Sequence, residues 1–237
     1  MILVDADIIA YKVGHVTGDV SEKYALSSLQ SAVSRWLTSA VTVPYFLDNV
    51  LSYNLYITGK GNFRKEVFPE YKANRIGKEK PKHLSAIMSS LVTDWSAIVA
   101  EGEEADDLIG IESTRLLDKC LIVTIDKDFD QLQGYHFNPD KDIFYYVSAW
   151  EGTVFFYKQI LTGDRVDNII GLYGVGEKKS SKMLEACETE LELYNNCVAI
   201  YKEREDLTDE EAESRILVVA RLLWLRRYDN QMWGKPE

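Results

Sequence analysis

Apolar runs of strand length alternate with amphipathic segments through the first part of the chain. Runs of this length predict buried strands, and four of them occur, at residues 2–4, 54–58, 97–100 and 120–125. Apolar side chains at helical spacing predict helices between these strands, over residues 21–42, 82–95 and 104–117. Strands that alternate with helices predict an α/β fold, in which helices flank a central and mostly parallel sheet.

The second part of the chain is predicted to be mainly helical after one hairpin. Residues 142–147 and 153–157 are rich in β-branched and aromatic side chains, and the turn pair Glu151-Gly152 lies between them. This pattern predicts two antiparallel strands. From Lys158 onward the apolar spacing is helical, so residues 188–237 are expected to form C-terminal helices.

Length and composition favour a globular domain with a sizeable core. The 237 residues fit one large domain or two small ones, and we expect a single domain over residues 1–237. The chain is 46% hydrophobic, which is enough for a sizeable core. It has no uncharged apolar run of 18 residues, so no membrane span is expected. The start lacks the basic region of a secretory signal, and the three cysteines lack metal-ligand spacing. Both features favour a reducing cytoplasm.

The net charge of −11 is concentrated in one segment. Residues 185–213 carry a net charge of −9, whereas residues 60–82 carry a net charge of +5. The acidic balance therefore does not exclude DNA as a partner, because the expected binding face is local. Glycines and prolines within residues 59–82 predict a mobile or partly helical excursion from the surface.

Carboxylates occur in ordered groups beside the predicted elements. Asp5 and Asp126 follow two strand ends, and ligands of parallel sheets bind at the carboxyl ends of strands. The other groups lie at helix starts, where acids also cap helices without any metal. Converging acids repel one another unless a cation lies among them, and Mg²⁺ prefers oxygen ligands. The candidate metal ligands are Asp5, Glu104, Asp106, Asp107, Asp126, Asp128, Asp164 and Asp167.

A glycine-rich turn that leads into lysines lies within residues 158–187. Glycines allow close approach of the backbone, and backbone N–H groups beside lysines bind phosphate. A glycine C-cap followed by a solvated basic helix start is the alternative interpretation. The candidate DNA-binding residues of this turn are Gly171, Gly174, Gly176, Lys178, Lys179 and Lys182.

Short motifs, in their order and spacing, resemble those of the 5′-nuclease superfamily of flap endonucleases and 5′-to-3′ exonucleases. They are residues 63–66 with 69–75, residues 104–107, residues 124–128 and residues 163–179. The chain is most similar to phage exonucleases and to the 5′-nuclease domain of bacterial DNA polymerase I. The resemblance implies a PIN-like fold with a helical arch or gateway at residues 59–82. It also implies a helix–three-turn–helix element at residues 158–187.

The resemblance implies roles for individual residues. The acids that match ligands of a first metal ion, or of its waters, are Asp5, Glu104, Asp106, Asp126 and Asp128. Those that match the surroundings of a second ion are Asp107, Asp164 and Asp167. Lys72 and Arg75 match a basic pair that stabilises charge on the scissile phosphate. Arg64 and Tyr71 lie beside this pair, and Tyr71 is expected either to stack on a terminal base or to pack internally.

The implied activity is metal-dependent hydrolysis of DNA phosphodiesters. The implied cofactors are two Mg²⁺ ions, which Mn²⁺ can replace, and a K⁺ ion at carbonyl oxygens of the glycine turn. Two ions suit the reaction because one activates water and the other stabilises the departing oxygen. The expected substrate is DNA with a free 5′ end, flap or nick, the products carry a 5′-phosphate, and the protein is expected to be a monomer.

One stretch departs from the family pattern. The family usually carries an aspartate after the second strand, but residues 57–62 contain no acid, and Asp48 could substitute only if the chain folded back differently. The missing acid keeps open a DNA-binding homologue with weakened catalysis. A PIN-like ribonuclease is a second alternative, which the glycine turn disfavours. A phosphatase with Asp5 as nucleophile and Asp7 as acid explains neither the basic stretch nor the glycine turn.

Overall fold

The computed structural model describes residues 1–17, 19–43 and 52–237 of the chain. Asp48 therefore lies outside the described residues. The chain forms two compact units. The first consists of residues 1–62, 78–147 and 226–229, and the second of residues 63–77, 148–225 and 230–237.

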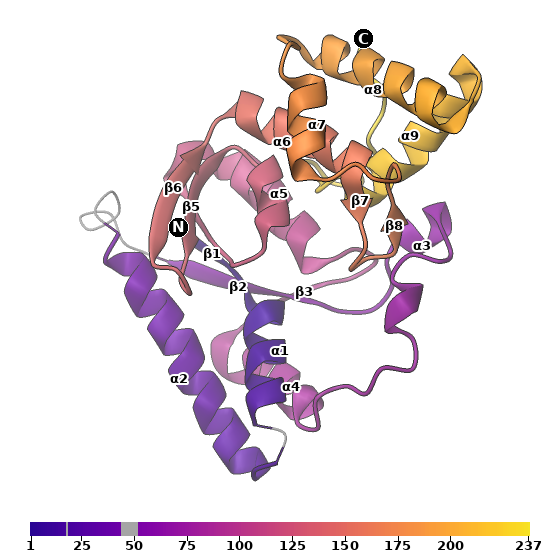
Figure 1. Ribbon diagram of the computed structural model, residues 1–237. Helices are drawn as coiled ribbons and strands as arrows, with labels where there is room; N and C mark the ends of the chain where they lie inside the picture. Colours follow the sequence, from indigo (N-terminus) through magenta and orange to yellow (C-terminus); the bar gives the residue numbers. More distant parts are fainter. Residues whose placement is uncertain (18, 44–51) are drawn as a thin grey trace. The chain divides into compact units, whose positions relative to one another are not determined.

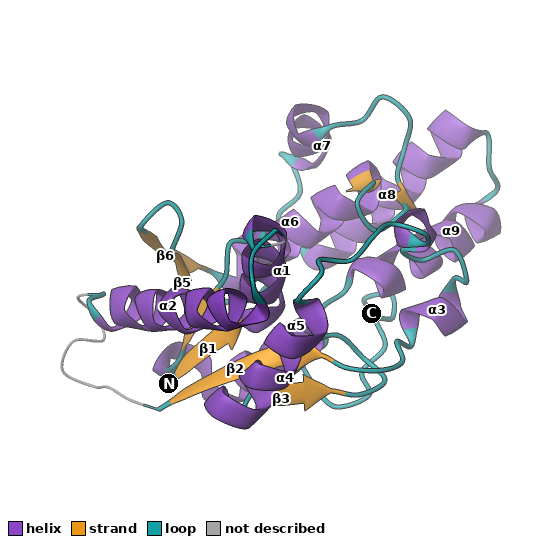
Figure 2. Cartoon of the chain, turned by 90° about the horizontal axis from the view of Figure 1, so that it is seen from below, coloured by secondary structure: helices purple, strands orange, loops and turns teal. Residues whose placement is uncertain are grey.

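The first unit contains a six-stranded sheet in the order β3-β2-β1-β4-β5-β6. Its strands are β1 (Ile2–Asp5), β2 (Tyr53–Thr58), β3 (Ile98–Ala100), β4 (Leu121–Val123), β5 (Gly134–Asn138) and β6 (Ile143–Val147). The strands from β3 to β5 pair in parallel, and only β6 pairs antiparallel. Figure 2 shows β1, β2 and β3 side by side. The prediction of a mostly parallel central sheet is confirmed.

Helices cover both faces of this sheet (Figure 1). They are α1 (Ala6–Val16), α2 (Glu22–Val41), α4 (Leu84–Trp95) and α5 (Ala105–Leu116). Alternate strand residues such as Val4 and Leu55 join the apolar side chains of α1, α2 and α4 in one core. Because successive side chains of a strand point to opposite faces, the buried Leu3 and Tyr56 point to the other face, where α5 packs on β1 and β2.

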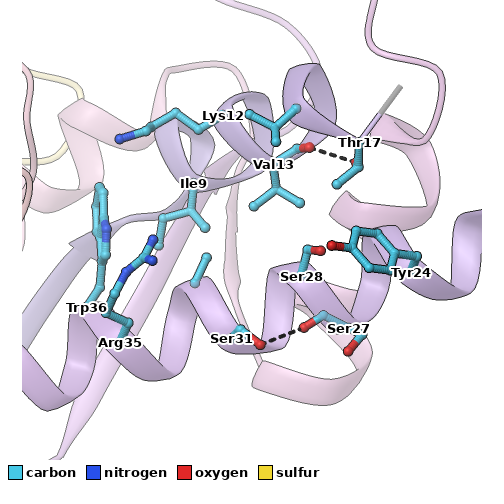
Figure 3. A pocket seen from close by; sticks show the side chains of 12 residues that line it. Ile9, Lys12, Val13, Thr17, Tyr24, Ser27, Ser28, Ser31, Arg35 and Trp36 are labelled. Carbon is cyan, nitrogen blue, oxygen red and sulfur yellow. Dashed lines mark hydrogen bonds between the residues drawn. The ribbon is translucent and has the colours of Figure 1, made fainter. Parts of the chain in front are cut away.

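A pocket of about 450 Å³ lies between α1 and α2 (Figure 3). Ile9 and Val13 of α1 form one wall, and Ser28 and Ser31 of α2 lie across from them. None of the described residues that line the pocket is acidic. The pocket therefore does not offer the carboxylates that a hard divalent cation needs.

The second unit is mainly helical. Its elements are α3 (Arg64–Val67), the 3₁₀ helix η2 (Ala73–Arg75), α6 (Ala149–Thr162), β7 (Gly163–Asp164), β8 (Ile169–Ile170), α7 (Glu177–Leu184), α8 (Glu190–Glu205) and α9 (Asp209–Leu223). Apolar side chains of α6, α8 and α9 form its core, together with Leu172 and Val175. These two side chains anchor the turn that follows β8, so the turn itself stays at the surface. No helix of the described ranges in either unit is long and apolar enough to cross a membrane.

The predicted strand at residues 153–157 is wrong, because this segment belongs to α6. Ser148 and Glu151 form a capping box at the start of α6: the Glu151 N–H donates to the Ser148 hydroxyl, and the Ser148 N–H donates to the Glu151 carboxylate. This pattern stabilises a helix start. The partner of β6 is instead β5, and the two strands form the hairpin.

Candidate metal and nucleic-acid sites

Asp5 lies at the carboxyl end of β1 and is buried, with 2% of its surface exposed. Its Oδ2 accepts a hydrogen bond from the Thr124 hydroxyl at 3.0 Å. Its Oδ1 is buried and has no hydrogen-bond partner among the described residues. Burial, followed by the negative charge of Asp7 and then of Asp126, raises the pKa of Asp5 to about 7. A nearby cation would stabilise the ionised form of this buried carboxylate, which lies beside other negative charges.

Asp7, which the sequence did not single out as a metal ligand, joins this edge of the sheet. It lies in the first turn of α1, and both of its carboxylate oxygens accept the Thr58 N–H, at 3.0 and 3.2 Å. Thr58 ends β2, the neighbour of β1 in the sheet. The spacing Asp5-Ala6-Asp7 was the available signal, because it places a second acid just beyond a strand end.

Asp126 and Asp128 follow β4 on the other side of β1. The Asp126 N–H donates to the Thr124 hydroxyl at 3.0 Å, and the Asp126 carboxylate accepts the Asp128 N–H at 2.9 Å. Asp126 thereby caps the 3₁₀ helix η4 (Lys127–Gln131). Because Thr124 also bonds Asp5, one hydroxyl links the ends of two adjacent strands. The structure thus brings together Asp5 and Asp126, as the sequence predicts.

Three predicted metal ligands lie at the start of α5: Glu104, Asp106 and Asp107. The Ala105 N–H donates to the Thr58 hydroxyl at 3.0 Å, which fixes the start of α5 at the end of β2. Asp107 is fully buried, and its two oxygens accept the N–H groups of Glu104 at 3.1 Å and of Arg226 at 3.2 Å. Asp107, predicted beside a second metal ion, therefore caps α5 and holds the backbone at Arg226. Glu104 and Asp106 lie at the same helix start.

This acidic edge suits a hydrated divalent ion better than a cage of protein ligands. Among the described residues, no three Asp, Glu, His or Cys side chains are placed to hold one metal ion together. Mg²⁺ keeps several waters, however, and needs only one or two direct carboxylates. The unsatisfied Oδ1 of Asp5, with Asp7 and Asp126 near enough to perturb its pKa, meets that requirement.

In the second unit, the segment 70–75 is fastened to the segment 165–168. The Lys72 N–H donates to the Asp167 carbonyl at 2.9 Å. The Asn74 amide donates to the carbonyls of Arg165 and Val166, at 2.9 and 3.1 Å. The Asn168 amide donates back to the Glu70 carbonyl at 2.8 Å. These two asparagine contacts join stretches far apart in the chain, and no sequence pattern predicted them.

The Asp167 carboxylate lies at the centre of this contact. It pairs with the Arg75 guanidinium, with the Lys72 ammonium at 3.3 Å and with the Tyr71 hydroxyl at 3.0 Å. Asp164 instead closes its own turn, because its carboxylate accepts the Val166 N–H at 2.7 Å. Asp167 thus fixes the two cations predicted to act on phosphate, a role that the sequence did not predict for it.

Two residues predicted to bind DNA are internal. Arg64 is 1% exposed, and its guanidinium donates to the carbonyls of Leu222 and Trp224, both at 2.8 Å. It therefore satisfies carbonyls at the end of α9 rather than a phosphate. Tyr71 is 2% exposed and belongs to the core of the second unit, so its internal packing, one of the two alternatives, is observed.

The glycine turn has the tight backbone that its sequence predicts. A Cβ on Gly171 would lie 2.2 Å from the carbonyl carbon of Thr162, and Gly174 has a φ of +70°. Gly176 is the N-cap of α7, from which Lys178 and Lys182 extend into solvent. The Lys179 ammonium, however, donates to the Gly174 carbonyl at 2.7 Å. It occupies one carbonyl oxygen of the turn for which a K⁺ ion was expected.

The sequence of the chain is similar to that of known proteins. A family model described as the 5′-3′ exonuclease, N-terminal resolvase-like domain matches residues 1–147. The flap endonuclease Xni of Vibrio campbellii is 30% identical over 173 residues, which are 64% of this chain and 64% of that protein. DNA polymerase I of Caldicellulosiruptor bescii is 32% identical over 162 residues, which are 56% of this chain and 18% of that protein. The chain thus spans less than two thirds of the length of these relatives.

Solved structures share the fold at lower identity. The T5 D15 protein co-crystallised with metal ions matches with a TM-score of 0.64 and 18% identity, over 92% of this chain and 88% of that one. The catalytic core of Rad2 in complex with DNA substrate matches with a TM-score of 0.54 and 16% identity, over 99% and 83%. At this identity the likeness establishes the fold alone.

Proposed function

Because this chain belongs to the 5′-3′ exonuclease family, whose N-terminal domain matches residues 1–147, we propose that it is a divalent-metal-dependent nuclease. In this proposal it hydrolyses DNA phosphodiesters as a 5′-to-3′ exonuclease or flap endonuclease and leaves 5′-phosphate products. Its substrate is DNA with a free 5′ end, flap or nick, and it acts as a monomer in the cytoplasm of a bacterium or of a phage host.

The observation that carries the proposal is the buried, unsatisfied oxygen of Asp5 among acids at one sheet edge. Mg²⁺, or Mn²⁺ in its place, would lower the pKa of a bound water and polarise the phosphate. Asp5 and Asp126 would hold this ion or its waters, and Glu104, Asp106 and Asp128 would hold further waters. Asp164 and Asp167 would serve a second ion in a two-metal reaction, whereas the capping contacts of Asp107 favour a structural role for it.

Lys72 and Arg75 are proposed to contact the scissile phosphate and to stabilise its developing negative charge. Their pairing with Asp167 supports this role, because it fixes two flexible cations before substrate binds. An arginine also offers paired donors that match phosphate oxygens. The glycine turn and the lysines 178 and 182 are proposed to hold the duplex. A K⁺ ion in that turn would have to compete with Lys179 for the Gly174 carbonyl.

The experiment that tests the proposal is cleavage of end-labelled flap, nicked, blunt and single-stranded DNA, with matched RNA, in Mg²⁺ and in EDTA. We expect Mg²⁺-dependent products from DNA that has a 5′ end or flap. Cleavage of RNA alone would favour a PIN-like ribonuclease. Binding of flap DNA without cleavage in either Mg²⁺ or Mn²⁺ would favour a homologue with weakened catalysis, the alternative raised by the acid-free stretch 57–62.

A further inference from the structure

No acidic side chain fits at position 59, directly after β2. A Cβ on Gly59 would lie 2.6 Å from both the Ala100 carbonyl oxygen and Val99 Cγ1. The Gly59 N–H donates to the same carbonyl at 2.8 Å, so backbone atoms of β3 occupy the space of a side chain. A carboxylate beside position 59 therefore comes from another element.

Asp7 brings a carboxylate to this place from α1. Both of its oxygens accept the Thr58 N–H, so the side chain lies against the last residue of β2. Asp5 ends the adjacent strand β1, two residues earlier in the chain, and its buried Oδ1 has no hydrogen-bond partner among the described residues. The two carboxylates thus occupy the ends of neighbouring strands although both belong to the junction of β1 and α1.

We propose that Asp7 supplies the carboxylate that β2 lacks, and that Asp5 and Asp7 together bind the divalent cation directly. This inference rests on the proposed nuclease function, and it adds to it a ligand that no motif assigns. The cation would satisfy the orphaned Oδ1 of Asp5 and offset the repulsion between the two acids. The remaining positions would be filled by water, as Mg²⁺ prefers.

The contact with Thr58 holds the Asp7 carboxylate in place. A backbone N–H that donates to a carboxylate fixes its orientation. Asp126, whose charge also acts on Asp5, would bind waters of the ion from the β4 side. The cation would then lie near the ends of β2, β1 and β4, but only Asp5 and Asp7 would bind it directly.

The test is direct measurement of Mn²⁺ binding by electron paramagnetic resonance, without DNA, on the wild type and on the variants Asp7→Asn, Asp5→Asn and Glu22→Gln. Asparagine at position 7 keeps an oxygen for the Thr58 N–H and removes only the charge. Glu22 is the matched control, because it is also an acid in the first turn of its helix and is exposed. We expect Asp7→Asn and Asp5→Asn each to weaken Mn²⁺ binding at least roughly tenfold, because loss of even a hydrogen-bonded partner of a ligand weakens metal binding about 10–100-fold, and we expect Glu22→Gln to bind like the wild type.

Wild-type affinity in Asp7→Asn, together with loss in Asp5→Asn, would overturn the role of Asp7 and leave the proposed nuclease intact. Absence of Mn²⁺ binding and of DNA cleavage in the wild type would overturn the proposed function itself. If Asp7→Asn fails to fold by circular dichroism, Fe²⁺-directed backbone cleavage of the wild type decides. Cuts near residues 5–8 and 57–59 are expected, and cuts confined to residues near Asp126 would contradict the proposal.

Discussion

Replacement of Arg64 by methionine separates a structural from a DNA-binding role. In the structure its guanidinium makes two hydrogen bonds of 2.8 Å to buried carbonyls at the end of α9. A hydrogen bond from a charged donor contributes about 1.5–3 kcal/mol. Methionine has a similar length but no donor, so Arg64→Met leaves both carbonyls unsatisfied. We therefore expect the free energy of unfolding to fall by about 3–5 kcal/mol.

The assay is urea unfolding followed by circular dichroism, with thermal melts as a second measurement. For a chain of this size, 1 kcal/mol corresponds to about 2–4 °C in Tm, so Arg64→Met should melt roughly 6–20 °C lower. Lys65→Met is the control, because Lys65 is an exposed neighbour in the same helix and should change the Tm little. An unchanged Tm with weaker DNA binding and a smaller salt dependence would contradict the structural role of Arg64, because it would make this residue a phosphate contact.

Three further perturbations test the contact made by Asp167, the glycine turn and the raised pKa of Asp5. Asp167→Asn should speed tryptic cleavage after Lys72 and Arg75 by about three- to tenfold. The reason is that it removes partly exposed ion pairs that contribute up to about 1 kcal/mol each. An unchanged cleavage rate would mean that Asp167 does not hold this segment in place. Lys179→Met should make duplex affinity, measured by fluorescence anisotropy, higher in K⁺ than in Na⁺, because it frees the Gly174 carbonyl; a K⁺ preference already present in the wild type would contradict this. In EDTA, the free energy of unfolding of the wild type relative to that of Asp5→Asn should fall as pH rises from about 4 to about 7, by up to about 1.4 kcal/mol per unit, because the folded chain keeps on Asp5 a proton that the unfolded chain loses. A difference that does not fall over this range would contradict the raised pKa.

Five strands of the sheet were predictable because they are short apolar runs with clear ends, whereas β5 was not predicted. The same feature placed Asp5 and Asp126 at the carboxyl edge, since parallel strands end on one side. The error at residues 153–157 arose because Thr-Val-Phe-Phe-Tyr suits a strand and a buried helix face equally. The Ser148-x-x-Glu151 pattern was the signal that decides for a helix.

Contacts between distant segments were beyond reach of the sequence. In the sequence, Arg64 resembles an exposed cation. Only the fold shows that two carbonyls at the end of α9 accept hydrogen bonds from it. Asp107 could be a metal ligand or a cap, and only the position of the Arg226 N–H shows that both its oxygens have backbone donors. Asp7 likewise gains its candidate role from the Thr58 N–H of a neighbouring strand. Each case depends on a backbone group whose place is set by the whole fold.

The most direct test of the central claim is Mg²⁺-dependent cleavage of a 5′-flap DNA by the wild type and by Asp126→Asn. We expect 5′-phosphorylated products in Mg²⁺, none in EDTA, and loss of cleavage in Asp126→Asn with flap binding largely retained. Equal cleavage by the wild type and by Asp126→Asn, or cleavage that persists in EDTA, would contradict it.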